Sequence, residues 1–583
     1  MSEAVLPPGW PAMSIQQAHA LMGGAVGQPT EIAEEVIRAV TLKVWKHQPP
    51  TLRSVAEMAK AHGEKVFLVY EDERVTFEAF HRAVAAFAVE LQAQGVVKGD
   101  RVAVIMRNLP EWVVAFYAAA SLGAIVTPLN AWWTGPELEY GLTDSGTKIA
   151  VMDAERYQRL TEHFANCPDL KRVYVSREVD EVAHPYVAKL ESVIGAPGDW
   201  AKLPDQPIPP VDIAPDDDAT IFYTSGTTGK PKGALATQRS INTNIITAGA
   251  AGARGFLRKG EMPPAPDPTQ PQRAMLLSVP FFHVTGCFAV LNPILFAGGK
   301  LVLMFKWDVI RAFELIEREK VTGAGGVPTI AWQLLEHPAR EKYDLSSLEG
   351  VSYGGAPSAP ELVRRLKEVF PKSQSGQGWG MTETCATVTS NGAEDYQNRP
   401  DSCGPAAAVA ELEIRDPADG VTVLPVGQMG ELWSKGPMNA KLYWNKPEAT
   451  AQTFVDGWVR TGDLAKLDEE GFCYILDRAK DMLIRGGENI YCVEVENVLY
   501  DHPAIMDAAV VAKPHRILGE EPAAVVTLKP GAEATEAELR AHVAERLAAF
   551  KVPVEIRFWH ETLPRNANGK ILKSELKKLF EGT

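Results

Sequence analysis

Cysteine is scarce in this chain, and positive charge falls short of negative charge. Six cysteines are scattered among 583 residues without a CxxC pair, which argues against a disulfide framework or a zinc site. We therefore expect reduced thiols and a cytoplasmic protein. The 59 Lys and Arg residues face 74 Asp and Glu residues, for a formal net charge of −15. Such a balance argues against nucleic acid as a main partner.

Long uninterrupted apolar runs are also missing. The run over residues 112–133 is uncharged but contains Gly123 and Pro128, and residues 274–305 are broken by prolines and glycines. Both are typical of buried helices and strands rather than of membrane spans. Residues 1–13 carry an acid and prolines where a signal peptide needs a basic and then an apolar region. We expect no transmembrane segment, and a peripheral membrane contact stays open.

Length and the order of predicted elements indicate an α/β protein of several domains. A chain of 583 residues with 46 % hydrophobic and 23 % charged residues is too long for one ordinary core. A helix from Thr76, a strand over residues 101–106 and a helix near Pro110 begin an alternation that recurs along the chain. This alternation predicts doubly wound, parallel sheets.

The pattern of predicted secondary structure changes twice towards the C-terminus. We expect a large N-terminal domain over residues 1–477, whose last part, residues 401–477, is a small β-rich subdomain, antiparallel or barrel-like. Residues 478–480 lie in a highly charged, exposed connection. A capping box precedes an amphipathic helix in residues 481–583, which we expect to form a compact α+β domain.

Residues 223–233 read YTSGTTGKPKG and follow a predicted strand. Four Ser and Thr hydroxyls, three glycines and two lysines fall within this stretch. Glycines let backbone N–H groups approach a ligand, hydroxyls donate hydrogen bonds and lysines neutralise charge, so the segment is typical of a polyphosphate-binding loop. It is not a Walker A loop, because only two residues separate Gly226 from Gly229 and Pro231 follows Lys230.

Other motifs carry suitable chemistry but are ambiguous singly. Trp379 lies between glycines, where a ring could face a base, although such a tryptophan more often packs in a core. Glu383 could bind Mg²⁺, which takes one or two protein carboxylates beside a nucleotide. Asp463 could accept ribose hydroxyls or be a solvated turn residue, and His283 could face a substrate or be a satisfied core residue. Lys570, on a loop, could deliver a cation to an active site or have no special role.

In their order along the chain, the motifs resemble those of the adenylate-forming superfamily: acyl-CoA synthetases, firefly-type luciferases and peptide-synthetase adenylation domains. They are YTSGTTGKPKG, PFFHVTG, GGAP, GWGMTE, RTGD, DRAKD, GGENI and NGK. The resemblance extends from about Thr76 to Lys573. It implies that residues 1–477 form an adenylation domain and that residues 478–480 are a hinge. A mobile C-terminal domain with the catalytic lysine would rotate about this hinge.

The resemblance implies a nucleotide site built from several segments. The β- and γ-phosphates would be held by Thr224, Ser225, Gly226, Thr227, Thr228, Gly229, Lys230 and Lys232. Adenine would lie against Gly354, Gly355, Ala356, Gly378, Trp379 and Gly380, with the Trp379 ring stacked on it. Asp463 and Arg478 would hold the ribose. Glu383, with Thr224, would bind Mg²⁺.

The resemblance also implies the reacting groups and the moving parts. The catalytic set would be Lys570, His283, Thr382 and Glu383. Lys570 would reach the carboxylate and the α-phosphate, Thr382 would touch the α-phosphate, and His283 would border the acid pocket. Lys480 would be the pivot of the hinge. The loop of Gly486 and Gly487 would face the nucleotide and help form a tunnel for the thiol.

The implied function is an ATP-dependent acid:CoA ligase that uses ATP, Mg²⁺ and coenzyme A. A fatty or other hydrophobic acid is favoured, because residues 322–329 and 281–282 offer small and apolar groups and no charge. An aryl or cinnamate-type acid is the alternative. A stand-alone adenylation enzyme or a luciferase-like enzyme would share the first half-reaction. The oligomeric state stays open.

Three departures from the superfamily pattern are visible. Trp379 stands where tyrosine is usual, Arg565-Asn566 where Lys-Thr is frequent, and Cys492 where proline is common after NIY. None of them removes a group that the chemistry requires.

Overall fold

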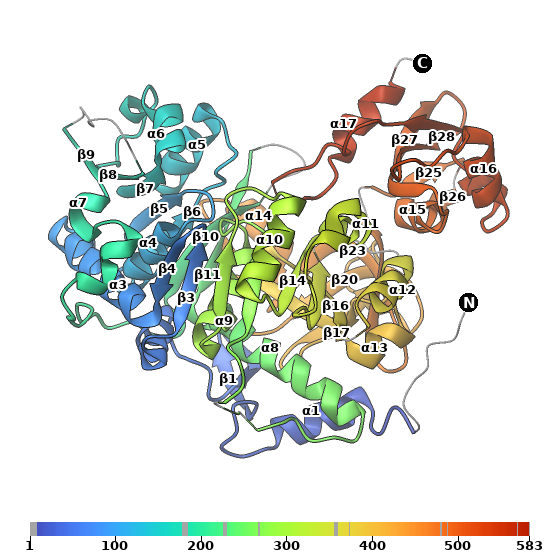
Figure 1. Ribbon diagram of the computed structural model, residues 1–583. Helices are drawn as coiled ribbons and strands as arrows, with labels where there is room; N and C mark the ends of the chain where they lie inside the picture. The colour runs from blue at the N-terminus through green and yellow to red at the C-terminus, as the bar shows by residue number, and fades with distance from the viewer. Residues whose placement is uncertain are drawn as a thin grey trace.

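The computed structural model describes residues 9–177, 185–224, 230–265, 267, 269–354, 360–371, 373–478, 481–486, 488–567 and 569–581. Two eight-stranded sheets build the large N-terminal domain, a third sheet follows them in the chain, and a fourth lies in the smaller C-terminal domain. Figure 1 shows this last part, orange to red, standing to one side of the rest. The architecture is the predicted α/β one.

The two large sheets are parallel in their middles. The first is antiparallel at its β21–β11–β10 edge and parallel at its β8–β9 edge, whereas the second is antiparallel at both edges. The first has the order β21(Leu442–Tyr443), β11(Lys232–Thr237), β10(Asp218–Thr224), β6(Ile125–Pro128), β5(Arg101–Ile105), β7(Ile149–Asp153), β8(Arg172–Ser176), β9(Val187–Lys189). The second has the order β17(Ala386–Gly392), β16(Gln374–Met381), β15(Gly350–Gly354), β14(Gly323–Gly326), β12(Ala274–Leu277), β13(Lys300–Leu303), β3(Val66–Tyr70), β4(Glu73–Thr76). Parallel neighbours need crossover helices, which cover the sheet faces.

The helices begin and end at residues that suit those positions. Their bounds are α1(Ile15–Gly23), α2(Leu52–Ala59), α3(Phe77–Ala93), α4(Pro110–Ser121), α5(Gly135–Ser145), α6(Ala154–Leu160), α7(Glu191–Ile194), α8(Gln238–Arg258), α9(Asn292–Ala297), α10(Val309–Glu319), α11(Pro328–Glu336), α12(Pro360–Val369), α13(Ala393–Asn398), α14(Pro447–Thr453), α15(Cys492–Tyr500), α16(Glu536–Ala544) and α17(Lys573–Lys577). Thr76 caps α3, because its hydroxyl accepts a hydrogen bond from the Ala79 N–H. Every residue of α4 is buried, which explains why the sequence from Trp112 onwards lacks charge.

The third and fourth sheets are smaller. The third is antiparallel throughout, with the order β18(Gly404–Pro405), β24(Phe472–Arg478), β23(Trp458–Leu467), β20(Gly430–Lys435), β19(Glu411–Arg415), and β22(Phe454–Val455) beside β23. The fourth has the order β26(Glu488–Ile490), β25(Leu483–Arg485), β28(Gly519–Leu528), β27(Ile505–His515), with β29(Glu555–Phe558) beside β28. Its core is a cluster separate from that of the large sheets, as expected for a domain with its own packing.

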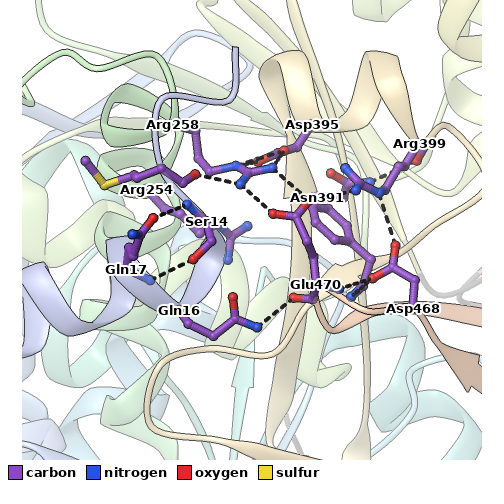
Figure 2. Close-up of polar contacts among 12 residues, drawn as sticks. Ser14, Gln16, Gln17, Arg254, Arg258, Asn391, Asp395, Arg399, Asp468 and Glu470 are labelled. Atoms are coloured by element: carbon purple, nitrogen blue, oxygen red, sulfur yellow. Dashed lines mark hydrogen bonds and ion pairs between the residues drawn. The ribbon is translucent and has the colours of Figure 1, made fainter. Parts of the chain in front are cut away.

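Hydrogen bonds join the N-terminal segment to a cluster of ion pairs at the end of α8 (Figure 2). This segment comprises α1 and the hairpin of β1(Ile32–Ile37) and β2(Val40–Trp45). The fully buried guanidinium of Arg258 bonds Asp395, the Met13 carbonyl and Glu470. Arg399 bonds the same Glu470 at 2.7 Å. Residues before the first large sheet are thereby tied to both α13 and the turn between β23 and β24.

Within the described part of the chain, no helix is both long and apolar enough to cross a bilayer. The uncharged stretch over residues 112–133 is α4, a turn and β6, as predicted. All six cysteines are buried and unpaired.

Candidate active site

The ends of the glycine- and hydroxyl-rich loop are fixed by an antiparallel strand pair. Thr224 is the last residue of β10 and lies opposite Lys232, the first residue of β11. The Lys230 ammonium lies 4.9 Å from the ring centre of Tyr140, and that of Lys232 lies 4.4 Å from the ring centre of Tyr443. Cation–π contacts therefore hold both lysines of the motif.

Glu383 sits in a one-turn 3₁₀ helix, Thr382–Thr384, that follows β16 and contacts β10. Its side chain is buried, and Tyr443 Oη donates a short hydrogen bond to Oε1. Oε2 has no hydrogen-bond partner among the described residues. Burial and then the neighbouring Glu383 raise the pKa of Tyr443, so the phenol stays a donor. Tyr443 thus touches both Lys232 and Glu383, and no local sequence pattern had singled it out.

The chain leaves this turn through two strained residues. Cys385 has φ 46° and Ala386 has φ 83°, a left-handed backbone that costs about 1–3 kcal/mol for each non-glycine residue. Asn244 of α8 is buried and compensates. Its Nδ2 donates to the Cys385 carbonyl at 2.6 Å, and its Oδ1 accepts from the Thr387 N–H at 3.1 Å. Asn244 is a second residue that sequence patterns missed, because its contacts lie 141 and 143 positions away.

Trp379 and Asp463 come from different sheets and meet. Trp379 Nε1 donates to Asp463 Oδ2 at 2.8 Å, and Arg478 Nε lies 3.2 Å from Asp463 Oδ1. Asp463 and Arg478 are direct partners of β23 and β24. The structure therefore brings together the aromatic ring and the two residues predicted to hold adenine and ribose.

Close packing of the strands around Trp379 requires glycine at Gly380 and at Gly354 of the neighbouring strand. A Cβ at Gly380 would lie 1.6 Å from the Ala386 carbonyl oxygen, and one at Gly354 would lie 2.9 Å from that of Gly378. Such distances are impossible for real side chains, so these positions need glycine for strands β15, β16 and β17 to approach. The need for glycine there holds with or without a ligand.

His283 follows β12 in a segment backed by the core. The Thr285 N–H donates to His283 Nδ1 at 3.2 Å, and burial lowers the pKa of His283 to about 4. The imidazole is therefore neutral near pH 7, with its proton on Nε2. Phe281 is fully buried and stacks on Trp112, with ring centres 4.9 Å apart, so its ring belongs to the core behind this segment.

The loop of Lys570 lies against the N-terminal domain. Gly569 has φ 77°, and a Cβ there would be 2.6 Å from Val327 Cγ2, at the junction of β14 and α11. Within the loop, the Lys570 N–H donates to Asn566 Oδ1 at 3.0 Å and the Asn566 N–H donates to the Lys570 carbonyl at 2.9 Å. A second contact between the two domains is that of the Lys529 ammonium, which lies 5.5 Å from the ring centre of Trp332 in α11.

Gly486 of the predicted thiol-tunnel loop has φ 59°, and its N–H donates to the Leu518 carbonyl at 2.8 Å. Several other predicted site residues lie outside the described residues: Ser225, Gly226, Thr227, Thr228, Gly229, Gly355, Ala356, Lys480 and Gly487. Among the described residues, no group of three or more His, Cys, Asp or Glu side chains is arranged to hold a metal ion.

Comparisons with known proteins agree with this geometry. Residues 55–444 match the family described as AMP-binding enzyme, and residues 494–570 match its C-terminal domain. The chain is 33 % identical over 557 residues to a long-chain-fatty-acid–CoA ligase of Bacillus subtilis, covering 90 % of this chain and 94 % of that one. It is 33 % identical over 509 residues to a feruloyl-CoA synthase of Amycolatopsis, covering 87 % and 94 %.

A solved structure of an acid–CoA ligase has a similar fold. An anthranilate CoA ligase, AuaEII, in complex with anthranoyl-AMP, superimposes with a TM-score of 0.77 at 26 % identity, over 90 % of this chain and 97 % of that one. The chain belongs to the AMP-binding enzyme family. This confirms the predicted superfamily, the fold class and the reaction class, an acid–thiol ligase that works with ATP, Mg²⁺ and CoA.

Proposed function

We propose that this chain activates a hydrophobic monocarboxylic acid as its acyl adenylate and transfers the acyl group to CoA. The observation that carries the proposal is Tyr443, which joins Lys232 of the phosphate loop to Glu383. A site for MgATP needs a cation that binds phosphate and a carboxylate that binds the metal ion. Tyr443 contacts one group of each kind, Lys232 and Glu383.

The nucleotide would lie between the phosphate loop, the turn of Glu383 and the strands β16, β23 and β24. Lys230 and Lys232 would neutralise the β- and γ-phosphates, and Thr382 would donate to the α-phosphate. Adenine would stack on Trp379. Asp463, with Arg478 beside it, would accept the ribose hydroxyls. This assignment is supported by the Trp379–Asp463–Arg478 contacts, which place a ring face and a carboxylate next to each other.

Mg²⁺ fits the donors that are present. Glu383 offers Oε2, which has no partner among the described residues, and Thr224 offers a hydroxyl at the end of β10, which contacts the turn of Glu383. A few oxygen ligands suit Mg²⁺, which keeps waters and substrate phosphates in its shell. When bound, the ion would neutralise phosphate charge. We assign Glu383 and Thr224 as its protein ligands.

The acid would lie beside β14 and α11. The Ser278 hydroxyl donates to the Gly325 carbonyl, and a Cβ at Gly326 would lie 2.6 Å from Ser278 Oγ and 2.9 Å from Ile330 Cδ1, so glycine keeps the backbone close to both side chains. The described surroundings are small or apolar, which favours a hydrophobic acid over a diacid or an amino acid. Apolar contacts discriminate by roughly 1–3 kcal/mol per methylene. Fatty and aryl acids both suit such a lining, and the fatty-acid and feruloyl relatives have equal identity to this chain.

In the first half-reaction the carboxylate attacks the α-phosphorus, and the bond to the pyrophosphate oxygen breaks. Charge spreads over phosphate oxygens, so positioning and cations do most of the work. Lys570 would stabilise that charge. The contact of its loop with Val327, beside the segment proposed to line the acid site, supports this role. His283, neutral and with Nε2–H available, would border the acid. In the second half-reaction the CoA thiol would enter after the C-terminal domain turns about Lys480.

Pyrophosphate and AMP release would test the proposal with butyrate, octanoate, dodecanoate, palmitate, cinnamate and 4-coumarate, each with and without CoA. We expect at least one acid to give pyrophosphate without CoA and continuous AMP formation with it. The best acid decides between fatty and aryl substrates. Adenylate formation that CoA never turns over would favour a stand-alone adenylation enzyme instead, and no pyrophosphate with any acid would contradict adenylation of these acid classes. The buried thiols support the cytoplasmic location that we propose.

A further inference from the structure

Asp477 is the last residue before the proposed hinge, and its carboxylate accepts hydrogen bonds from the first hinge residue and from the C-terminal domain beyond the hinge. The side chain is buried, with 3 % exposure. Oδ1 accepts from the Arg478 N–H at 2.7 Å, and Oδ2 accepts from the Cys492 N–H at 2.5 Å. Asp477 belongs to β24 of the third sheet, whereas Cys492 is the first residue of α15 in the C-terminal domain. One hydrogen bond thus spans residues 478–480.

The donor in this bond depends on a departure from the superfamily pattern. Proline is common at the position of Cys492, and proline has no N–H. The first turn of a helix leaves its N–H groups without partners inside the helix, so a buried carboxylate there satisfies one of them and is favoured by the helix dipole. The cysteine therefore gives this chain a bond that a proline chain cannot form.

Asp477 interacts electrostatically with Lys573, which lies in the same segment of the chain as Lys570. Lys573, three residues after Lys570 and the first residue of α17, pairs with Glu496 at 2.7 Å. Burial raises the pKa of Asp477 to about 6, and the positive charge of Lys573 opposes that rise. The facing ionisable groups are Lys573 and Glu496, beside the backbone donors of Arg478 and Cys492. Asp477 is therefore held by the same cluster that anchors the start of α17.

We propose that Asp477 is a positioning residue which, through the N–H of Cys492, holds the C-terminal domain in the orientation that places the Lys570 loop on Val327. The inference rests on the proposed function, in which this orientation serves adenylation. Rotation about residues 478–480 has to break the Asp477–Cys492 bond before CoA can react. The bond thus favours the first half-reaction over the second.

Cys492→Pro removes the N–H together with the thiol. Proline suits the first position of a helix, and Tyr491 before it has φ −87° and ψ 115°, the extended backbone that a residue before proline prefers. Cys492→Ala is the matched control, since it loses the thiol and its 3.2 Å contact with the Asp481 carbonyl but keeps the N–H. Asp477→Asn, which weakens the acceptor by removing its charge, is a second test if the proline variant folds poorly.

Two half-reactions would be measured on the full chain with the best acid of the panel. They are pyrophosphate release in a single turnover without CoA, and CoA ester formation from the synthetic acyl adenylate. We expect Cys492→Pro and Asp477→Asn to slow the first by about tenfold and to leave the second unchanged or faster, with Cys492→Ala like the wild type. Equal loss of both half-reactions, or a proline variant that matches the alanine variant, would overturn the inference. A wild-type chain without either half-reaction would instead refute the proposed function.

Discussion

A single indole N–H joins Trp379 to the carboxylate of Asp463, across two sheets. The superfamily's usual tyrosine carries a hydroxyl instead of this indole N–H. The indole ring has a face for adenine and an edge that fixes Asp463. Trp379 therefore combines a stacking role with an orienting role in the proposed site.

Trp379→Phe keeps a ring face and removes the donor. We expect the KM for ATP to rise about tenfold with little change in kcat, because a hydrogen bond to a charged group contributes about 1.5–3 kcal/mol. The preference for ATP over 3′-deoxy-ATP should shrink, since Asp463 loses its orientation. Steady-state kinetics with both nucleotides would measure this. Trp458→Phe, on the same strand as Asp463, is the control, and an unchanged KM in Trp379→Phe would contradict the role.

His283 gives a prediction about pH. Its pKa is about 4 in the folded protein and 6.5 ordinarily, so between these values the unfolded chain binds more protons. The free energy of unfolding therefore falls as pH drops from 6.5 towards 4. His283→Gln should remove that part of the loss, so the variant should lose less stability than the wild type between pH 7 and pH 4.5 in urea unfolding. Replacement of the exposed His560 by Gln is the control, and equal acid sensitivity of His283→Gln and wild type would refute the buried neutral state.

At the scale of elements, some helices and strands are set by local sequence pattern and others by tertiary packing. The strand expected over residues 101–106 is β5, Arg101–Ile105, and the helix expected from Thr76 is α3 with Thr76 as its cap. Both follow from local signals, hydrophobic runs and a capping hydroxyl. The strand β14 has the sequence GAGG, in which Ala324 carries the one side chain, so its local pattern is weak. A Cβ at Gly325 would lie 1.7 Å from the Ser352 carbonyl oxygen of β15, so glycine is needed for these two strands to pair.

The attachment of α1 and the β1–β2 hairpin can be tested at Arg258. Its guanidinium is 1 % exposed between Asp395 and Glu470. Removing one partner of a buried ion pair costs about 3–5 kcal/mol, so Arg258→Gln should release the segment of residues 9–48 first. Limited proteolysis followed by mass spectrometry should show new cleavage there. Lys202→Gln, which breaks an exposed pair, should leave the cleavage pattern unchanged, and resistance of this segment in Arg258→Gln would contradict the anchoring role.

At the scale of the whole molecule, the proposed site is divided between two domains. The nucleotide groups lie in the large domain, and Lys570 is delivered by a loop of the small one, against Val327. Each half-reaction therefore depends on the relative position of two bodies with separate cores.

Lys570→Ala should separate the two half-reactions. We expect pyrophosphate release to fall by at least about a hundredfold, because a cation aimed at developing charge is lost. CoA ester formation from supplied acyl adenylate should change by less than about twofold. Lys578→Ala, on the exposed surface of the same domain, is the control. Equal loss of both half-reactions would contradict the role given to Lys570.

The sequence by itself determined the family, the order of the domains and most groups of the proposed chemistry, because these are carried by short contiguous motifs that can be recognised by their residues and their order along the chain. Only the tertiary structure showed that Tyr443 bridges Lys232 and Glu383, that Asn244 holds two strained residues, and that Asp477 bonds Cys492 across the hinge. These contacts join residues far apart in the chain, apart from the short span across the hinge. Their geometry depends on how strands from different sheets are brought together, which no local pattern of residues encodes.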